Sequence, residues 1–402
     1  MVFSENAEPV SRVRYPVRWK LLLSLAALLV GLVASELFYR GMLWLELAAR
    51  STRPDFYALN KPLLQFDAKF GYSYAPGESI ITCVVRRGAI HTWHSLTIDA
   101  NGNMAEPPST APEPVKVLIF GDSFTSNPYQ PFGWPHFFAR DSTFQVHNFA
   151  RAGYGLLQMI DLAAAKTREL EPDFIIVAFI MEDLIRARAW HTVVDIDGQP
   201  TPVVGADPSR LHDPAFAMET GVIDPALTTG WCQAQMARPD PSDPLLVRLN
   251  ARYQSMAGRR QRNFLLNPQQ SLLVNLLAHH DPYHGMRTPT ITPKTPLKSF
   301  EADAQFVSAI KSINVPMLLI VLPNYDELAT QDSRPTKRML TLLHSLQTLT
   351  GSSPHFLFQS MGTPGNIERL FLLPEDQHPS AAGSEAYATA IAMLVEESGM
   401  AQ

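Results

Sequence analysis

The sequence contains little cysteine, few charged residues and no long run of either charge. Its two cysteines, Cys83 and Cys232, belong to no Cys-x-x-Cys motif and to no Cys/His spacing of the kind that binds zinc. A net charge of −5 without a Lys or Arg run provides no surface that could neutralise phosphates, so we expect no nucleic-acid partner. The absence of internal repeats and low-complexity tracts argues against a repeat protein and against a disordered chain.

With 46% apolar and 18% charged residues in 402 positions, the composition is typical of a folded protein with a sizeable core. Cys83 and Cys232 could form one disulfide if they lie outside the cytoplasm, or they could remain two buried thiols; the sequence leaves both alternatives open. We expect no metal site and no cofactor. One segment contains residue types that often bind metals: His279, His280, Asp281 and His284. It lies in a predicted loop without a second such cluster, so a solvated turn explains it better.

The N-terminal region contains an apolar segment about one bilayer in length. Residues 21–35 carry no charge, and residues 21–40 together are long enough for roughly one membrane crossing. Four basic residues precede this segment: Arg12, Arg14, Arg18 and Lys20. By the positive-inside rule they predict that residues 1–20 are cytoplasmic and that the chain after the segment lies on the other side of the membrane. A cleaved signal peptide, with small residues at 33–35, and a buried core helix are the alternatives. A helical pattern that continues over residues 36–50 favours a retained anchor.

Beyond residue 40 the pattern divides the chain into four further regions. Residues 41–110 predict a membrane-proximal helix followed by a β-rich extension. Residues 111–190 and 297–402 alternate strands with helices, which is the pattern of a parallel sheet covered on both faces. The intervening residues 191–296 contain 13 of the 33 prolines and are too long for a simple crossover, so we expect a partly helical cap insertion.

The alternating regions predict the individual elements of an α/β fold. Strands are expected at residues 115–120, 144–148, 174–180, 316–322 and 355–358. Helices are expected at residues 156–170, 298–313, 336–349 and 380–397, the last one followed by Gly399 as a stop. Within the insertion, residues 245–257 and 271–278 have helical apolar spacing.

The strongest chemical signal is the sequence VKVLIFGDSFT over residues 115–125. An apolar strand runs into Ser123 through Gly121, which permits a tight turn, at the strand end where open α/β sheets bind ligands. A helix that begins at this serine would direct N–H groups toward an oxyanion. The alternative is a tight turn with an N-capping serine and no chemistry.

A second signal precedes the last predicted helix. In LPEDQHPSAAG, residues 373–383, Asp376 and Glu375 stand two and three residues before His378. A serine nucleophile needs a base, and the base needs a carboxylate that orients it. Alone, Asp-x-His could be a surface turn, but combined with Ser123 it predicts a catalytic triad.

These segments resemble the GDSL/SGNH hydrolase superfamily, in particular its bacterial membrane-anchored members, over residues 115–179 and 316–395. The resemblance implies a flavodoxin-like three-layer α/β fold in which Ser123 is the nucleophile and an oxyanion-hole donor. It implies that His378 is the general base, oriented by Asp376 or, as the alternative, by Glu375. Gly153, within NFARAGYG, corresponds to the glycine that offers a second N–H to the oxyanion.

One block departs from the family pattern. Where the family has Gly-x-Asn-Asp after the third strand, Glu182 replaces the asparagine of the oxyanion hole. An ionised carboxylate only accepts hydrogen bonds, and the loss of one such donor costs about 10²–10³ in turnover. Glu182 could be protonated, another donor could compensate, the site could be weak or dead, or the residue could simply be a carboxylate at a helix start.

Two functions of different classes follow as hypotheses. The first is a serine ester hydrolase or O-acyltransferase, acting outside the cytoplasm on acyl esters, acetyl esters included, of a cell-surface saccharide or lipid. The second is a catalytically silent binding or assembly protein; a flavodoxin-like protein that is not a hydrolase is a third. Arg151 could meet an anionic substrate but is expected on the surface, and His91 and His94 are expected at a strand edge.

Overall fold

The computed structural model describes residues 17–51, 56–67, 70–140, 143–186, 191–196, 199–204, 222–266, 299–331, 335–362, 365–372 and 377–400. The chain divides into two compact units. The first comprises Met1–Arg50 and Gln261–Pro289, and the second comprises Ser51–Arg260 and Thr290–Gln402.

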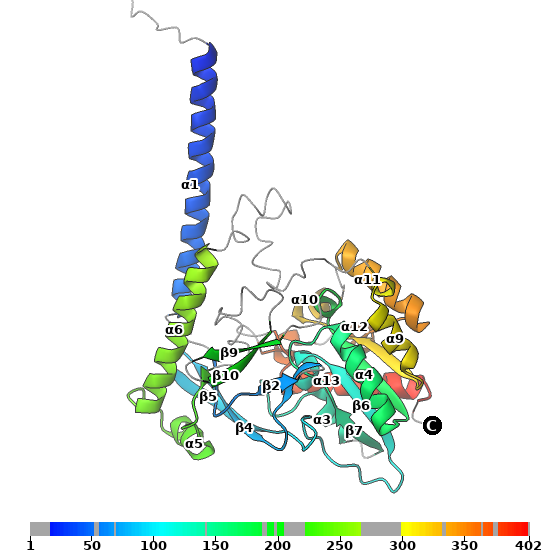
Figure 1. The fold of residues 1–402 in the computed structure, drawn as a ribbon. Helices are drawn as coiled ribbons and strands as arrows, with labels where there is room; N and C mark the ends of the chain where they lie inside the picture. Colours follow the sequence, from blue (N-terminus) through cyan, green and yellow to red (C-terminus); the bar gives the residue numbers. More distant parts are fainter. Residues whose placement is uncertain are drawn as a thin grey trace, which may run out of the picture. The chain divides into compact units, whose positions relative to one another are not determined.

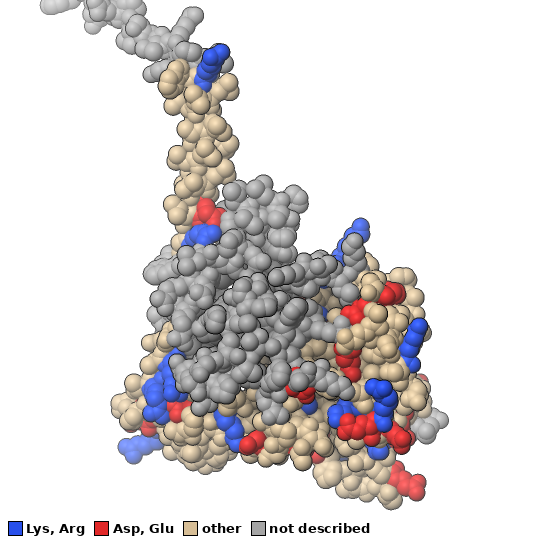
Figure 2. Space-filling model, viewed as in Figure 1, with Lys and Arg blue, Asp and Glu red and all other residues tan. Residues whose placement is uncertain are grey.

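The first unit contains helix α1, Val17–Ser51. Its stretch Leu21–Met42, 22 residues with a mean hydropathy of 2.3, is long and apolar enough to cross a membrane, and none of it is buried by protein. The stretch includes the ion pair of Glu36 and Arg40, and Figure 2 shows the helix surface without Lys, Arg, Asp or Glu atoms between the blue group at its upper end and a red and blue pair lower down. The predicted membrane-proximal helix is not separate, because α1 continues through residues 41–51 without a break.

The second unit is built on a five-stranded parallel sheet with the order β13-β12-β8-β6-β7. Its strands are β6 (Val115–Gly121), β7 (Phe144–Asn148), β8 (Phe174–Phe179), β12 (Met317–Val321) and β13 (His355–Phe356). The predicted parallel α/β architecture is therefore confirmed. The last predicted strand is wrong in its second half, because helix α12, Leu357–Met361, begins there.

Helices cover both faces of this sheet (Figure 1). On one face lie α4 (Leu156–Leu170), α9 (Ala304–Ser312) and α11 (Lys337–Thr350); on the other lie α3 (Trp134–Ala139), α12 and α13 (Ala381–Glu397). Successive strand residues alternate between the two cores, so that Phe120 packs with the first layer and Ile119 with the second. Helix α9 begins later than predicted, because Asp303 caps it by accepting from the N–H of Phe306.

The predicted β-rich extension consists of a mixed sheet and a hairpin. Strands β1 (Phe56–Leu59), β4 (Ser79–Arg86) and β5 (Ala89–Thr97) form the sheet β11-β1-β4-β5, whose fourth strand, β11 (Val222–Ile223), comes from the insertion. Strands β2 (Leu64–Asp67) and β3 (Gly71–Tyr74) form the hairpin. Tyr72, Tyr74, Ile80 and Leu96 bury their side chains in the same core as the central sheet, so the extension is part of one packed body with it.

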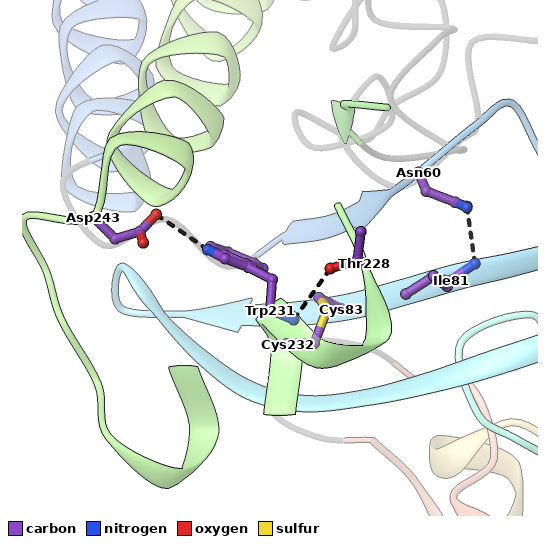
Figure 3. Close-up of a disulfide and its surroundings, with 7 residues drawn as sticks. All are labelled: Asn60, Ile81, Cys83, Thr228, Trp231, Cys232 and Asp243. Atoms are coloured by element: carbon purple, nitrogen blue, oxygen red, sulfur yellow. Dashed lines mark hydrogen bonds between the residues drawn. A yellow bond between two sulfur atoms is a disulfide. The ribbon is translucent and has the colours of Figure 1, made fainter. Parts of the chain in front are cut away.

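In the described part of the insertion, residues 222–253 pack on the extension. Besides β11 it includes a β9–β10 hairpin (His191–Ile196 and Gln199–Val204) and helices α5 (Thr229–Ala237) and α6 (Pro244–Leu266). Cys232 of α5 forms a disulfide with Cys83 of β4, with 6.6 Å between their Cα atoms (Figure 3). This bond answers the question that the sequence left open, and together with β11 it attaches the insertion to the extension sheet. The cap remains a prediction. The predicted helix at residues 271–278 lies outside the described residues.

Candidate active site

The nucleophile candidate stands at the carboxyl end of β6, which lies between β8 and β7 in the parallel sheet. The short helix α2, Ser123–Ser126, begins immediately after it, capped by Asp122, whose Oδ1 accepts a 2.8 Å hydrogen bond from the N–H of Phe124. A Cβ atom at Gly121 would lie 2.7 Å from the carbonyl oxygen of Ala178 on the neighbouring strand, so only glycine fits there. The turn therefore holds Ser123, which is 8% exposed, at the edge of the sheet.

His378 lies against this serine. Its Nε2 is 2.7 Å from Ser123 Oγ, a hydrogen-bond distance, although the two residues are 255 positions apart. For the hydroxyl to donate, the imidazole must carry its proton on Nδ1. The ring is held between two aromatic side chains, with centroid distances of 4.9 Å to Phe124 and 4.5 Å to Tyr129. The fold thus brings together the serine and the histidine that the sequence singled out.

Asn127 joins the two chain segments. Its Nδ2 donates to the carbonyl oxygen of Pro379, at 2.9 Å, and to Ser384 Oγ, at 3.3 Å. The residue is fully buried and ends α2 in the left-handed conformation, at φ +42°, which asparagine adopts more readily than most residues. Since Pro379 follows His378 directly, this side chain fixes the histidine relative to the serine. Sequence reasoning missed it.

The histidine also belongs to a hydrogen-bonded loop before α13. Its carbonyl oxygen accepts from the N–H of Leu372 at 2.9 Å, and the N–H of Ser380 donates to Leu370 at 2.8 Å. Ser380 caps α13 by accepting from the N–H of Gly383 at 3.2 Å. The two predicted triad carboxylates, Asp376 and Glu375, lie outside the described residues, so the identity of the triad acid stays a prediction.

Gly153 lies in a turn beside the nucleophile. The turn is closed by the N–H of Tyr154, which donates to Arg151 at 3.1 Å, and Gly153 has φ +81°, a conformation that favours glycine. The N–H of Arg151 donates to Gly121 at 2.9 Å, which attaches the turn to β6. Within the described ranges, the backbone N–H groups of Ser123 and Gly153 donate to no protein acceptor.

Glu182 stands in the 3₁₀ helix η1, Met181–Leu184, directly after β8. Its side chain is half-buried, and its Oε2 is buried without a hydrogen-bond partner in the part of the chain that the structure describes. The sequence prediction of a carboxylate in the first turn of a helix agrees with this position. No amide donor occupies the place where the family resemblance implies one.

The neighbouring acids form a buried cluster around one arginine. Asp122 and Asp183 are both 0% exposed, and Arg186 Nη1 lies 3.4 Å from Asp122 Oδ2 and 2.6 Å from Asp183 Oδ1. Burial raises the pKa of Asp122, while Arg186 and His378 act in the opposite direction. Burial and then the charge of Asp122 raise the pKa of Asp183 well above its ordinary value, against the effect of Arg186.

The β-rich extension holds the two loops next to Ser123. The hydroxyl of Tyr74 donates to Ser126 Oγ at 2.9 Å and accepts from the N–H of Ala152 at 3.3 Å. His94 lies in the edge strand β5, as predicted, but it is buried, and its Nε2 is 3.1 Å from the carbonyl oxygen of Pro128. Burial lowers the pKa of His94 to about 4, so the neutral ring donates to that carbonyl. This supporting role could not be read from the sequence.

Arg151 is not the surface residue that the sequence predicted. It is 3% exposed, its Nη2 donates to Asn103 Oδ1 at 3.0 Å and its guanidinium lies 4.9 Å above the ring of Tyr74. Both partners come from the extension, which covers the loop. Burial lowers the pKa of Arg151. The group packs the extension against the Gly153 turn.

The other sequence candidates give no second site. His91 is exposed on β5, and the residues His279, His280, Asp281 and His284 lie outside the described part of the chain. Among the described residues, no group of three or more His, Cys, Asp and Glu side chains is placed to hold a metal ion.

Comparison with known proteins adds little to this geometry. No family model matches the chain, and no curated protein matches it. A solved structure that resembles it is the crystal structure of a candidate acylhydrolase from Bacteroides fragilis, which is 12% identical over 73% of this chain and 91% of the other, with a TM-score of 0.30.

Proposed function

We propose that this chain is a serine ester hydrolase or O-acyltransferase of the SGNH type. The observation that supports it is the 2.7 Å separation of Ser123 Oγ and His378 Nε2 at the carboxyl edge of a parallel sheet. A serine and a histidine at this distance form the nucleophile and base pair of acyl-transfer enzymes. The two N–H groups of Ser123 and Gly153, which have no protein acceptor among the described residues, suit an oxyanion.

The mechanism follows from these positions. Ser123 Oγ attacks the ester carbonyl while His378 Nε2 takes its proton, and the carbonyl oxygen becomes an oxyanion bound by the N–H groups of Ser123 and Gly153. His378 then protonates the leaving alcohol, which leaves an acyl group on Ser123. Water or an acceptor hydroxyl, deprotonated by His378, releases the acyl group. Asp376, or Glu375 in its place, holds the Nδ1 proton in this proposal.

The proposed location is the extracytoplasmic side of a membrane, with α1 as anchor and the N-terminus in the cytoplasm. The apolar stretch Leu21–Met42 supports the anchor. The disulfide between Cys83 and Cys232 supports an oxidising compartment, since disulfides rarely persist in the cytoplasm. An enzyme so placed would act on acyl esters, acetyl esters included, of a cell-surface saccharide or lipid.

Glu182 favours a second candidate, a catalytically silent binding or assembly protein, because a carboxylate stands where the resemblance implies an amide donor. A fluorophosphonate probe separates the two. The enzyme is supported if the wild-type protein is labelled, if Ser123→Ala abolishes the labelling, and if Ser95→Ala, which changes an exposed serine on β5, leaves it unchanged. Absence of labelling in the folded wild-type protein supports the binding protein.

A further inference from the structure

Three separate loops meet at a single nitrogen atom behind the candidate site. Arg186 Nη1 lies 2.6 Å from Asp183 Oδ1, 3.4 Å from Asp122 Oδ2 and 3.4 Å from the carbonyl oxygen of Tyr154. Asp183 belongs to η1 after β8, Asp122 precedes Ser123 after β6, and Tyr154 follows Gly153 in the turn after β7. Each of the three segments that carry a predicted oxyanion-hole residue thus accepts one hydrogen bond from the guanidinium of Arg186.

The charges make this contact strong. The carboxyl groups of Asp122 and Asp183 are fully buried, and the side chain of Arg186 is 20% exposed. Without the cation, the two carboxylates would repel each other, because the protein interior screens charges poorly. Either the loops that carry them would move apart or one of the two acids would take up a proton. The guanidinium therefore holds the end of β6 and the end of β8 together.

The backbone of Gly155 packs closely against Arg186. A Cβ atom at Gly155 would lie 2.7 Å from the Cβ of Arg186 and 2.9 Å from its carbonyl oxygen. The glycine that begins α4 is thus required by the close approach of Arg186, at a φ of −94° that any residue could adopt. A larger side chain there has to displace the arginine.

On the basis of the proposed function, we propose that Arg186 is a positioning residue that sets the geometry of the oxyanion hole by holding the Ser123, Gly153 and Glu182 segments in register. It does not touch the reacting atoms in this mechanism. Its effect is exerted through the N–H groups of Ser123 and Gly153, whose separation depends on the three loops.

The test uses the full-length protein in detergent, with p-nitrophenyl acetate as the substrate. Arg186→Met removes the charge at similar length and is expected to lower kcat about 10²-fold, the effect of misplacing a reacting group by about 1 Å, with little change in KM. Arg186→Lys is expected to recover most of this loss, because all three contacts are made by one nitrogen and an ammonium has three donors. Arg248→Met, which removes an arginine bound to Asp224 on the extension side, is the matched control and should keep wild-type kcat.

Gly155→Ala tests the same contact without altering the arginine, and it also serves if Arg186→Met does not fold. It is expected to lower kcat about tenfold or more through a displacement of a few tenths of an ångström. Wild-type kcat in Arg186→Met, equal losses in the Met and Lys variants, or wild-type kcat in Gly155→Ala would each overturn the proposal. If the wild-type protein itself neither turns over ester nor reacts with fluorophosphonate, the proposed function has failed, which is a different result from a loss confined to the Arg186 variants.

Discussion

The hydrogen bonds of Asn127 give the sharpest prediction about how the site is assembled. Asn127→Gly removes both bonds from Nδ2, to Pro379 and Ser384, but leaves the left-handed backbone unstrained because glycine adopts φ +42° freely. Each bond is worth about 1 kcal/mol, so the free energy of unfolding should fall by about 2 kcal/mol. The loss of Oδ1 adds nothing, since this atom is buried without a partner in the described part of the chain.

Asn127→Ala is the companion variant. It loses the same two bonds and also places a Cβ-bearing residue without a polar side chain at positive φ, which should cost about 1 kcal/mol more. Urea unfolding of both variants separates the hydrogen-bond contribution from the backbone contribution. Because Pro379 follows His378, both variants should also lower kcat about 10²-fold toward p-nitrophenyl acetate. A free energy of unfolding within about 0.5 kcal/mol of wild type for Asn127→Gly would refute the reasoning.

Three further predictions concern other parts of the molecule. Replacing both Cys83 and Cys232 by alanine opens a loop of 149 residues and should lower the free energy of unfolding by about 5 kcal/mol in the loop-entropy account; a loss below about 1 kcal/mol in urea unfolding would contradict it. Since burial holds the pKa of His94 near 4, below its ordinary 6.5, the unfolded chain binds the proton first as the pH falls. Between pH 7 and pH 4 the free energy of unfolding should therefore fall by about 3 kcal/mol more in the wild type than in His94→Gln. Equal pH dependence of the two proteins in urea unfolding would count against this reasoning. Glu182→Asn restores an amide donor and should raise kcat by about 10-fold to 100-fold; an unchanged or lower kcat would mean that this position does not reach the oxyanion.

The sequence was sufficient for those parts of the site that are encoded by neighbouring residues. A run of apolar residues that ends in Gly-Asp-Ser contains its own strand and its tight turn, and both occur where the pattern predicted them, whereas the N-cap of α2 is Asp122 and not Ser123. Gly153 likewise adopts the positive φ that its place in the turn requires. The strands and helices of the central sheet follow from apolar periodicity, because each of them buries a face against the same core.

Errors arose where a residue's surroundings come from distant parts of the chain. Arg151 was predicted at the surface, yet Tyr74 and Asn103 of the extension cover it. The attachment of the insertion was likewise not predicted: Val222 and Ile223 add a strand to the extension sheet, and Cys232 is bonded to that sheet. Nothing within a few positions of these residues carries that information, since burial and pairing depend on which surfaces the whole fold brings together.

The sequence by itself determined that a parallel α/β sheet carries a serine at a strand end and a histidine before the last helix, because strand, turn and helix signals are local. The tertiary structure alone decided that His378 Nε2 and Ser123 Oγ are 2.7 Å apart, that Asn127 holds their two loops together and that Arg186 joins the Ser123 loop to the loops after β7 and β8. Contacts between residues that are tens to hundreds of positions apart depend on the packing of the entire core, which no short pattern contains.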